Sequence, residues 1–230
     1  MCGRFTRQSP TDVLVKDFAI EKVTVDMNPS YNVSPGQDIA VVVGHSLREL
    51  VSRRWGLIPH WAKDPSIGYK MINARSETVG EKPSFKLCYR ERRCLVLADG
   101  FYEWKKEGKV KCPYYIRTAS GRSFAMAGIW DSWDSPAGTR LFTCSILTTE
   151  ANSRLSSIHN RMPVILSRED EQKWLGTGSD ELGFLESLMR PYEEEELDIY
   201  MVSDRVNSTK HDDPSCVKAQ ETETEPEELF

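Results

Sequence analysis

The residue with the most distinctive chemistry in this sequence is Cys2, which directly follows Met1. Once Met1 is removed, Cys2 carries a free α-amine and a free thiol on adjacent carbon atoms. Such a pair can act as a nucleophile with a built-in base, or can condense with an aldehyde and close a five-membered thiazolidine ring. The first residues lack the charged and apolar stretches of a secretion signal. We therefore expect chemistry at Cys2; a terminal cysteine without a role is the alternative.

A second polar cluster, residues 72–78, interrupts otherwise apolar sequence and contains Asn73, Arg75 and Glu77. In an extended chain these three side chains would lie on one side, because successive side chains of a strand alternate. An amide next to an arginine is suited to holding a sugar-phosphate group. Near the start of the chain, Arg4 offers a second guanidinium fork for a phosphate or a carboxylate.

Glu103 lies in a third cluster, residues 98–104, which follows an apolar strand and is rich in aromatic residues. Aromatic neighbours would remove water from the carboxyl group, and burial raises the pKa of a carboxyl group. Glu103 could then exchange protons near neutral pH. The alternative is a surface glutamate at the end of a strand.

His159 lies in a fourth cluster, residues 157–163, between an expected short helix and an apolar strand. Loops at such junctions often carry catalytic side chains, and histidine is the side chain best able to move protons at physiological pH. A hydrogen-bonded structural histidine is the alternative. A cysteine, an amide, a carboxyl group and an imidazole together supply a nucleophile and its proton-transfer partners, but their spacing in sequence does not show that they meet.

Length and composition favour one soluble domain, because 230 residues with 39% hydrophobic side chains are enough for a single core. The six cysteines show neither a CxxC pair nor zinc-site spacing, which indicates a reduced cytoplasmic protein without a metal or cofactor. The location would be near the nucleoid in a bacterium and nuclear in a eukaryote. No apolar stretch approaches the roughly 20 residues that span a bilayer, so no membrane role is expected.

The net charge of −5 is unevenly distributed along the chain. Residues 191–230 hold 13 acidic and 3 basic side chains, which leaves 22 acidic against 27 basic in residues 1–190. Residues 53–122 contain 16 Lys/Arg against 7 Asp/Glu, interleaved with aromatic residues. Cations among aromatic rings suit a single-stranded nucleic acid, whose phosphates they neutralise and whose bases stack on the rings. A solvated charged face over an aromatic core is the alternative.

The hydrophobic patterning predicts an α+β fold, a single domain of mainly antiparallel β-structure with a barrel-like sheet core and peripheral short helices. A hairpin tip is expected at residues 106–109, and a helix is expected after Ser9 as N-cap and Pro10 as its first residue. Residues 1–216 would form the domain, and residues 217–230 an acidic, disordered tail. We expect a monomer. Strands are predicted at residues 39–43, 50–57, 94–97, 114–117, 124–130, 141–148 and 164–166, and further helices at residues 150–156, 167–175 and 179–189.

Several motifs, in order along the chain, resemble the SRAP family, the SOS response-associated peptidases. The resemblance runs from residue 1 to about residue 207 and leaves only the acidic tail outside. The motifs are Met-Cys-Gly-Arg at residues 1–4, Tyr-Asn-Val-Ser-Pro at 31–35, Arg-Trp-Gly-Leu-Ile-Pro at 54–59, Ile-Asn-Ala-Arg-Ser-Glu-Thr at 72–78, Asp-Gly-Phe-Tyr-Glu-Trp at 99–104, Ile-His-Asn-Arg-Met-Pro at 158–163, Val-Ser at 202–203 and Val-Asn at 206–207.

This resemblance implies a sensor of abasic sites in single-stranded DNA that cross-links itself to the lesion. The α-amine of Cys2 would attack the deoxyribose aldehyde to form a Schiff base, and the thiol would then close a thiazolidine. Asn73 would orient Cys2 or the sugar. Glu103 would assist ring opening, proton transfers and reversal, and His159 would handle protons at the sugar oxygen and the imine.

The resemblance also implies a DNA-binding surface. Arg4, Arg75 and Arg161 match positions expected to hold the flanking phosphates, while Pro35 and Trp61 match the part of the family surface that wedges against bases. Some members carry a second aromatic residue after the tryptophan, where this chain has alanine. We therefore expect weaker base stacking at the wedge.

Two further functions are compatible with the same sequence. In the first, Cys2 is the nucleophile of a cysteine peptidase of the N-terminal-nucleophile type, whose activity could be limited to autocatalytic release of Met1. In the second, the basic and aromatic stretch makes a single-stranded DNA-binding module without a covalent step.

Overall fold

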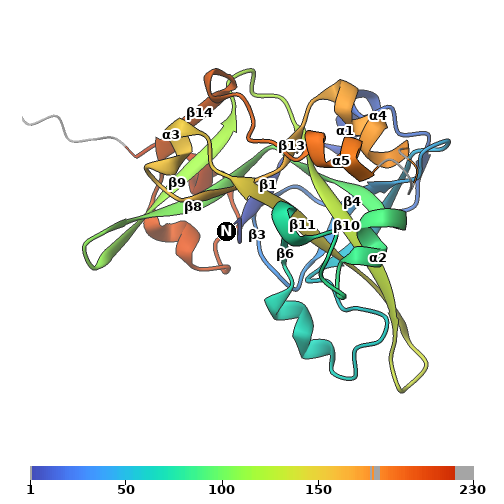
Figure 1. Cartoon of the computed structure of the whole chain (residues 1–230). Coiled ribbons are helices and arrows are strands. Elements are labelled where there is room, and N and C mark those ends of the chain that lie inside the picture. The colour runs from blue at the N-terminus through green and yellow to red at the C-terminus, as the bar shows by residue number, and fades with distance from the viewer. Residues whose placement is uncertain (1, 177, 179–181, 221–230) are drawn as a thin grey trace, which may run out of the picture.

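The computed structural model describes residues 2–176, 178 and 182–220, and within them the strands form two sheets (Figure 1). One sheet has the strand order β14-β9-β8-β1-β3, and the other follows the path β12-β11-β10-β7-β4-β5-β2, with β13 on β10 and β6 on β11. The strands are β1 (Phe5–Arg7), β2 (Lys22–Val23), β3 (Ser30–Val33), β4 (Asp38–Val43), β5 (Glu49–Trp55), β6 (Asn73–Arg75), β7 (Arg93–Ala98), β8 (Gly100–Glu107), β9 (Val110–Thr118), β10 (Phe124–Asp134), β11 (Arg140–Glu150), β12 (Arg161–Pro163), β13 (Ile165–Leu166) and β14 (Leu197–Met201).

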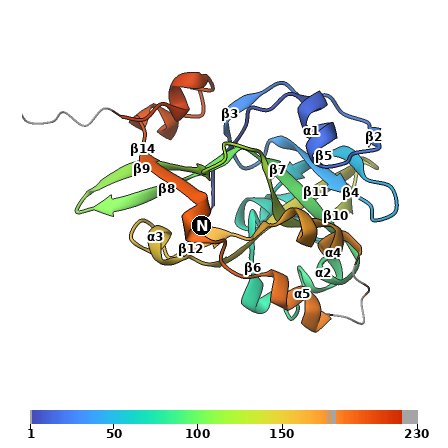
Figure 2. The same ribbon diagram turned by 90° about the horizontal axis from the view of Figure 1, so that it is seen from above.

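Most strand pairs are antiparallel, and the helices are short and lie around the sheets (Figures 1 and 2). The predicted fold class, a single mainly antiparallel β domain with peripheral short helices, is confirmed. No helix in the described ranges is both long and apolar enough to cross a bilayer. The α-helices are α1 (Thr11–Asp17), α2 (Lys86–Glu91), α3 (Ser153–Ser156), α4 (Arg168–Gly176) and α5 (Leu182–Leu188), and the 3₁₀ helices are η1 (Pro65–Lys70), η2 (Ser76–Thr78), η3 (Glu194–Glu196), η4 (Asp204–Asn207) and η5 (Pro214–Val217).

Each strand predicted from the sequence overlaps an observed strand, but several boundaries differ. The strand expected at residues 50–57 ends at Trp55, because Gly56 has a φ of 127° and its backbone approaches Gly68 too closely for any side chain. The expected hairpin tip at 106–109 is present, since Glu107 pairs with Val110 across the turn between β8 and β9. The short strands β1, β2, β3, β6, β12 and β14, as well as β8, were not predicted.

The start of α1 differs from the prediction. Pro10, not Ser9, is the N-cap, and its side chain makes no capping hydrogen bond. Ser9 is engaged elsewhere, because its hydroxyl and its backbone N–H both donate to the carboxylate of Asp99. The helix expected at 150–156 is also shorter, since Glu150 still belongs to β11 and Asn152 caps Leu155 at the start of α3.

The chain remains attached to the body beyond the predicted end of the domain. The backbone N–H of Gln220 donates to the carbonyl oxygen of Met201 at 2.9 Å, and Ala219 forms a β-bridge with Val202. Residues 219 and 220 are therefore hydrogen-bonded to the body, and the boundary at residue 216 stays a prediction. Residues 221–230 lie outside the described residues, so the disordered tail stays a prediction. Residues 179–181 of the helix expected at 179–189 also lie outside them.

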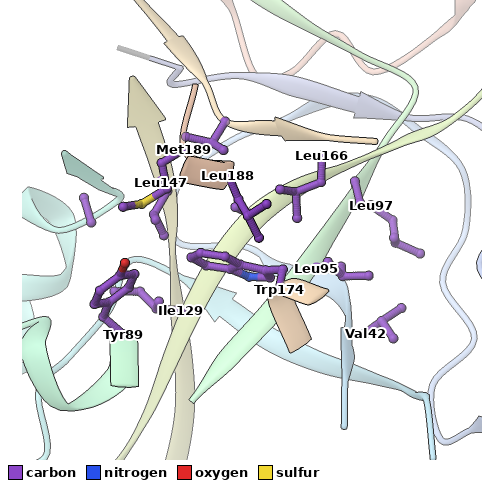
Figure 3. Close-up of a cluster of buried hydrophobic side chains, with 14 of the residues drawn as sticks. Val42, Tyr89, Leu95, Leu97, Ile129, Leu147, Leu166, Trp174, Leu188 and Met189 are labelled. Atoms are coloured by element: carbon purple, nitrogen blue, oxygen red, sulfur yellow. The ribbon is translucent and has the colours of Figure 1, made fainter. Parts of the chain in front are cut away.

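Buried side chains form two large clusters separated by the second sheet. One contains Trp174, which is fully buried and donates from its indole Nε1 to the carbonyl oxygen of Cys94 at 3.1 Å. Figure 3 shows the ring among side chains of β7 and α5 such as Leu95 and Leu188. The other cluster takes residues from both sheets and includes Cys2 and Phe101. Cys2 is therefore part of the core between the sheets.

Replacing Trp174 by alanine should lower the free energy of unfolding by about 3–5 kcal/mol, because the truncation leaves a cavity where a complete ring was buried. Urea unfolding measures the change. Phe184→Ala is the matched control, since Phe184 is 42% exposed and its truncation should cost far less. Equal losses in the two variants would contradict the packing described for Trp174.

Candidate active site

Cys2 lies immediately before β1, which pairs with β3 on one side and with β8 on the other. The Cys2 side chain is fully buried, and its only hydrogen bond among the described residues is a weak one from the thiol to the carbonyl oxygen of Arg4. Burial, reinforced by the charge of Glu103, raises the pKa of the Cys2 thiol far above its usual value. The thiol is therefore neutral at physiological pH.

Asn73 holds the backbone of Cys2. Its Nδ2 donates to the carbonyl oxygen of Cys2 at 2.8 Å, and it is placed there by β6, in which Asn73 pairs with Ile146 of β11. The Oδ1 of Asn73 is buried and has no hydrogen-bond partner in the described part of the chain. A buried acceptor without a partner is uncommon in proteins, and this one is suited to receive a donor from an amine or a sugar hydroxyl.

Glu103 is 2% exposed and lies on β8 two residues after Phe101, so both side chains are on the same face of the strand. Phe101 belongs to the core cluster that contains Cys2. Burial raises the pKa of the Glu103 carboxyl group to about 7. The predicted desolvation is confirmed, and both protonation states are populated near neutral pH.

His159 follows α3 at the entry to β12. Depending on the tautomer, its Nδ1 accepts from the backbone N–H of Arg161 at 3.0 Å or donates to the carbonyl oxygen of Arg161 at 3.3 Å. Burial lowers the pKa of the imidazole, so the neutral ring predominates at pH 7.

Glu103 and His159 line the same open pocket of about 570 Å³, together with Trp104, Lys111 and Asn207. Because Glu103 also acts electrostatically on the Cys2 thiol, and Asn73 bonds to Cys2, the structure brings the four predicted residues into one neighbourhood. In the described residues, no three His, Cys, Asp or Glu side chains are grouped so that they could hold a metal ion.

Two of the arginines expected to hold phosphates make internal contacts instead. Arg4 donates from Nη1 to Asn32 Oδ1 at 2.6 Å and to the carbonyl oxygen of Val206 at 2.8 Å. Arg161 is 9% exposed and donates from both Nη atoms to the carboxylate of Glu77. These guanidinium groups stabilise the walls of the site, and their phosphate contacts stay predictions.

Arg75, Trp61 and Pro35 lie nearer the surface. Arg75 is exposed, and its side chain has no hydrogen bond or ion pair within the described ranges. Trp61 is 51% exposed and Pro35 partly exposed. Their DNA contacts also stay predictions. The expectation that Glu77 shares a strand face with Asn73 and Arg75 is wrong, because β6 ends at Arg75 and Glu77 lies in η2.

The loop that carries Trp61 is fixed by residues that the sequence did not suggest. Asp131 on β10 is 1% exposed and accepts from the backbone N–H of His60 at 2.9 Å, while the indole Nε1 of Trp133 donates to the carbonyl oxygen of Ala62 at 2.7 Å. The residues on both sides of Trp61 are therefore anchored. A carboxylate within an apolar strand is the one sequence signal that could have indicated this role.

The β domain in which Asn73 holds Cys2 near the buried carboxyl group of Glu103 matches a known protein family. A model of the SOS response associated peptidase (SRAP) family matches residues 1–209. The chain belongs to this family, which confirms the resemblance.

Relatives cover almost the whole chain. This chain is 44% identical over 223 residues to the Abasic site processing protein YoqW of Bacillus subtilis (strain 168), and the match covers 95% of this chain and 100% of that protein. It is 34% identical over 268 residues to the Abasic site processing protein HMCES of Mus musculus, covering 94% of this chain and 75% of that protein. A crystal structure of a protein from Bacteroides thetaiotaomicron has a TM-score of 0.88 at 29% identity, covering 95% of this chain and 100% of that one.

The raised pKa of Glu103 predicts a pH-dependent stability. Between about 4.5 and 7 the folded protein keeps a proton that the unfolded chain has released, so rising pH lowers the free energy of unfolding, on the order of 3 kcal/mol across the window. Glu103→Gln should lack this component. Urea unfolding at pH 5 and pH 8 measures it, with Glu107→Gln at an exposed position as control. A wild type and a Glu103→Gln variant with the same pH profile would show that the carboxyl group is not desolvated.

Proposed function

We propose that this protein recognises abasic sites in single-stranded DNA and forms a covalent cross-link to them through Cys2, once the peptide bond before Cys2 has been cleaved. The observation that carries this proposal is the convergence of Asn73 and Glu103 on Cys2, with Glu103 and His159 in one pocket. The names of the relatives, which are abasic site processing proteins, support the same substrate.

The first step opens the sugar and joins it to the amine. An abasic deoxyribose is mostly a closed hemiacetal, so the C1 hydroxyl must lose a proton while the ring oxygen gains one. Glu103, with a pKa of about 7, can in its protonated form give a proton to the ring oxygen, and the neutral ring of His159 can take the proton of the C1 hydroxyl. The α-amine of Cys2 then adds to the aldehyde carbon, and loss of one water molecule gives a Schiff base.

The second step closes the ring. The thiol of Cys2 adds to the imine carbon, its proton moves to the nitrogen, and a five-membered thiazolidine forms with no further loss of atoms. Because burial keeps the thiol protonated in the free protein, the amine acts first and the thiol follows. Asn73 holds the carbonyl group of Cys2 and so orients both nucleophiles.

The family description also includes a peptidase. Cleavage of the bond before Cys2 by the Cys2 thiol itself would be such an activity, and it would prepare the amine for the cross-link. We place it before the cross-linking reaction and not in competition with it.

In protein prepared without Met1, Cys2→Ala should abolish the adduct that survives heating in detergent, because the amine at residue 2 is present but no thiol can close the ring. Borohydride should still trap a Schiff base in this variant. Intact mass measures both products, and the wild-type adduct should equal protein plus abasic oligonucleotide minus one water. Protein that retains a residue before Cys2, as checked by its intact mass, should not form the heat-stable adduct; such an adduct in either protein would remove Cys2 from the mechanism.

Arg75→Ala should weaken binding of single-stranded DNA in a salt-dependent way, because each phosphate contact releases counterions. One lost contact lowers the slope of log K against log salt by about 0.7. Fluorescence anisotropy at several salt concentrations measures the slope. Arg140→Ala removes the same charge at an exposed pair with Asp134 and is the control; identical slopes in the two variants would contradict a phosphate contact at Arg75.

A further inference from the structure

The site pocket is also lined by two side chains with hydrogen-bond donors that have no part in the steps above. Lys111 of β9 and Asn207 of η4 line the pocket with Glu103 and His159. They come from distant parts of the chain, since β9 follows the β8–β9 hairpin and η4 follows β14. Figure 1 shows this hairpin extending to one side of the body, with β14 alongside β9.

Asn207 is held in one orientation. The indole Nε1 of Trp104 donates to its Oδ1 at 2.7 Å, which leaves the two N–H groups of Nδ2 for other partners. The backbone just before Asn207 is also fixed, because the carbonyl oxygen of Val206 accepts from Arg4 and from Asn32. The amide is therefore preset to present donors.

Lys111 supplies a positive charge beside this amide. Its side chain is exposed, and its ammonium group takes part in no ion pair within the described part of the chain. Two other lysines of the same hairpin are either ion-paired or outside the pocket lining. Lys105 is paired with Glu107 at 2.8 Å, and Lys106, which lies opposite Lys111 in the hairpin register, does not line the pocket.

We propose that Lys111 and the Nδ2 group of Asn207 form a binding subsite for the phosphate adjacent to the abasic sugar. The inference rests on the proposed function, because it takes the sugar to lie between Glu103 and His159. A phosphodiester presents only acceptors, and an ammonium with an amide N–H₂ presents only donors. The subsite also supplies a contact that Arg4 and Arg161, which are engaged internally, are less able to make.

The test uses the mature full chain and a single-stranded oligonucleotide with a tetrahydrofuran abasic analogue, which has no aldehyde and so reports binding alone. Three oligonucleotides are compared: an unmodified one, and two in which a neutral methylphosphonate replaces the phosphate on the 5′ or the 3′ side of the analogue. The variants are Lys111→Gln and Asn207→Asp, with Lys106→Gln as the matched control.

Lys111→Gln should weaken binding of the unmodified oligonucleotide about three- to tenfold and lower the salt slope by about 0.7. A methylphosphonate at one of the two positions should weaken binding by the wild type by a similar factor, and it should hardly change binding by Lys111→Gln. Asn207→Asp keeps an acceptor for Trp104 but places a carboxylate at the subsite. It should weaken binding of the unmodified oligonucleotide, and the methylphosphonate at the same position should remove most of that loss. Lys106→Gln should respond to both oligonucleotides as the wild type does.

If Lys111→Gln and Lys106→Gln lose the same affinity, and neither methylphosphonate removes the difference from wild type, the lysine acts only through general attraction and the subsite is wrong. A heat-stable adduct between the wild type and natural abasic DNA, measured in parallel, keeps this result separate from the proposed function. Coupling to one phosphate without any adduct would retain the subsite and reject the covalent step.

Discussion

The burial of Cys2 and Phe5 between two sheets is the constraint on which the rest of the structure depends. Chain ends are ordinarily exposed and mobile, but here β1 is the inner partner of β3 and β8. Phe5 packs against Trp55 with ring centres 5.2 Å apart, and Cys2 is in the same cluster. A reactive group at a free terminus would sample many positions, whereas this arrangement fixes Cys2 beside Asn73 and Glu103.

The same burial sets the protonation of the site. Removal of water raises the pKa of the Cys2 thiol and of the Glu103 carboxyl group and lowers that of the His159 imidazole, because the charged form of each is the less stable in a poorly solvated place. The three groups are thus neutral or close to half-titrated at neutral pH. Imine formation requires such groups, since it needs an unprotonated amine and repeated proton transfers near pH 7.

Hydrophobic patterning indicated the long strands well, and the short ones poorly. Most of β7 and residues 124–130 of β10 are continuous apolar runs, which is the pattern of strands buried on both faces. Strands of two to four residues such as β1 and β6 carry too few side chains to show a period. They exist because a neighbouring strand offers hydrogen bonds, and that neighbour is distant in sequence. The N-cap at Pro10 was missed for a similar reason, since Asp99 lies 90 residues from Ser9.

The sequence by itself determined the chemistry that is present: a cysteine at position 2, a carboxyl group among aromatic residues, a histidine at a helix–strand junction and an excess of cations. The tertiary structure decided which of these groups are free. Arg4, Arg75 and Arg161 are equivalent as letters, but two of them donate to internal oxygens and only Arg75 remains open within the described part of the chain. The tertiary structure also brought Lys111 and Asn207 to the lining of the pocket. The physical reason is that a side chain's charge belongs to its residue type, whereas its partners and its exposure to water depend on contacts between segments far apart in the chain.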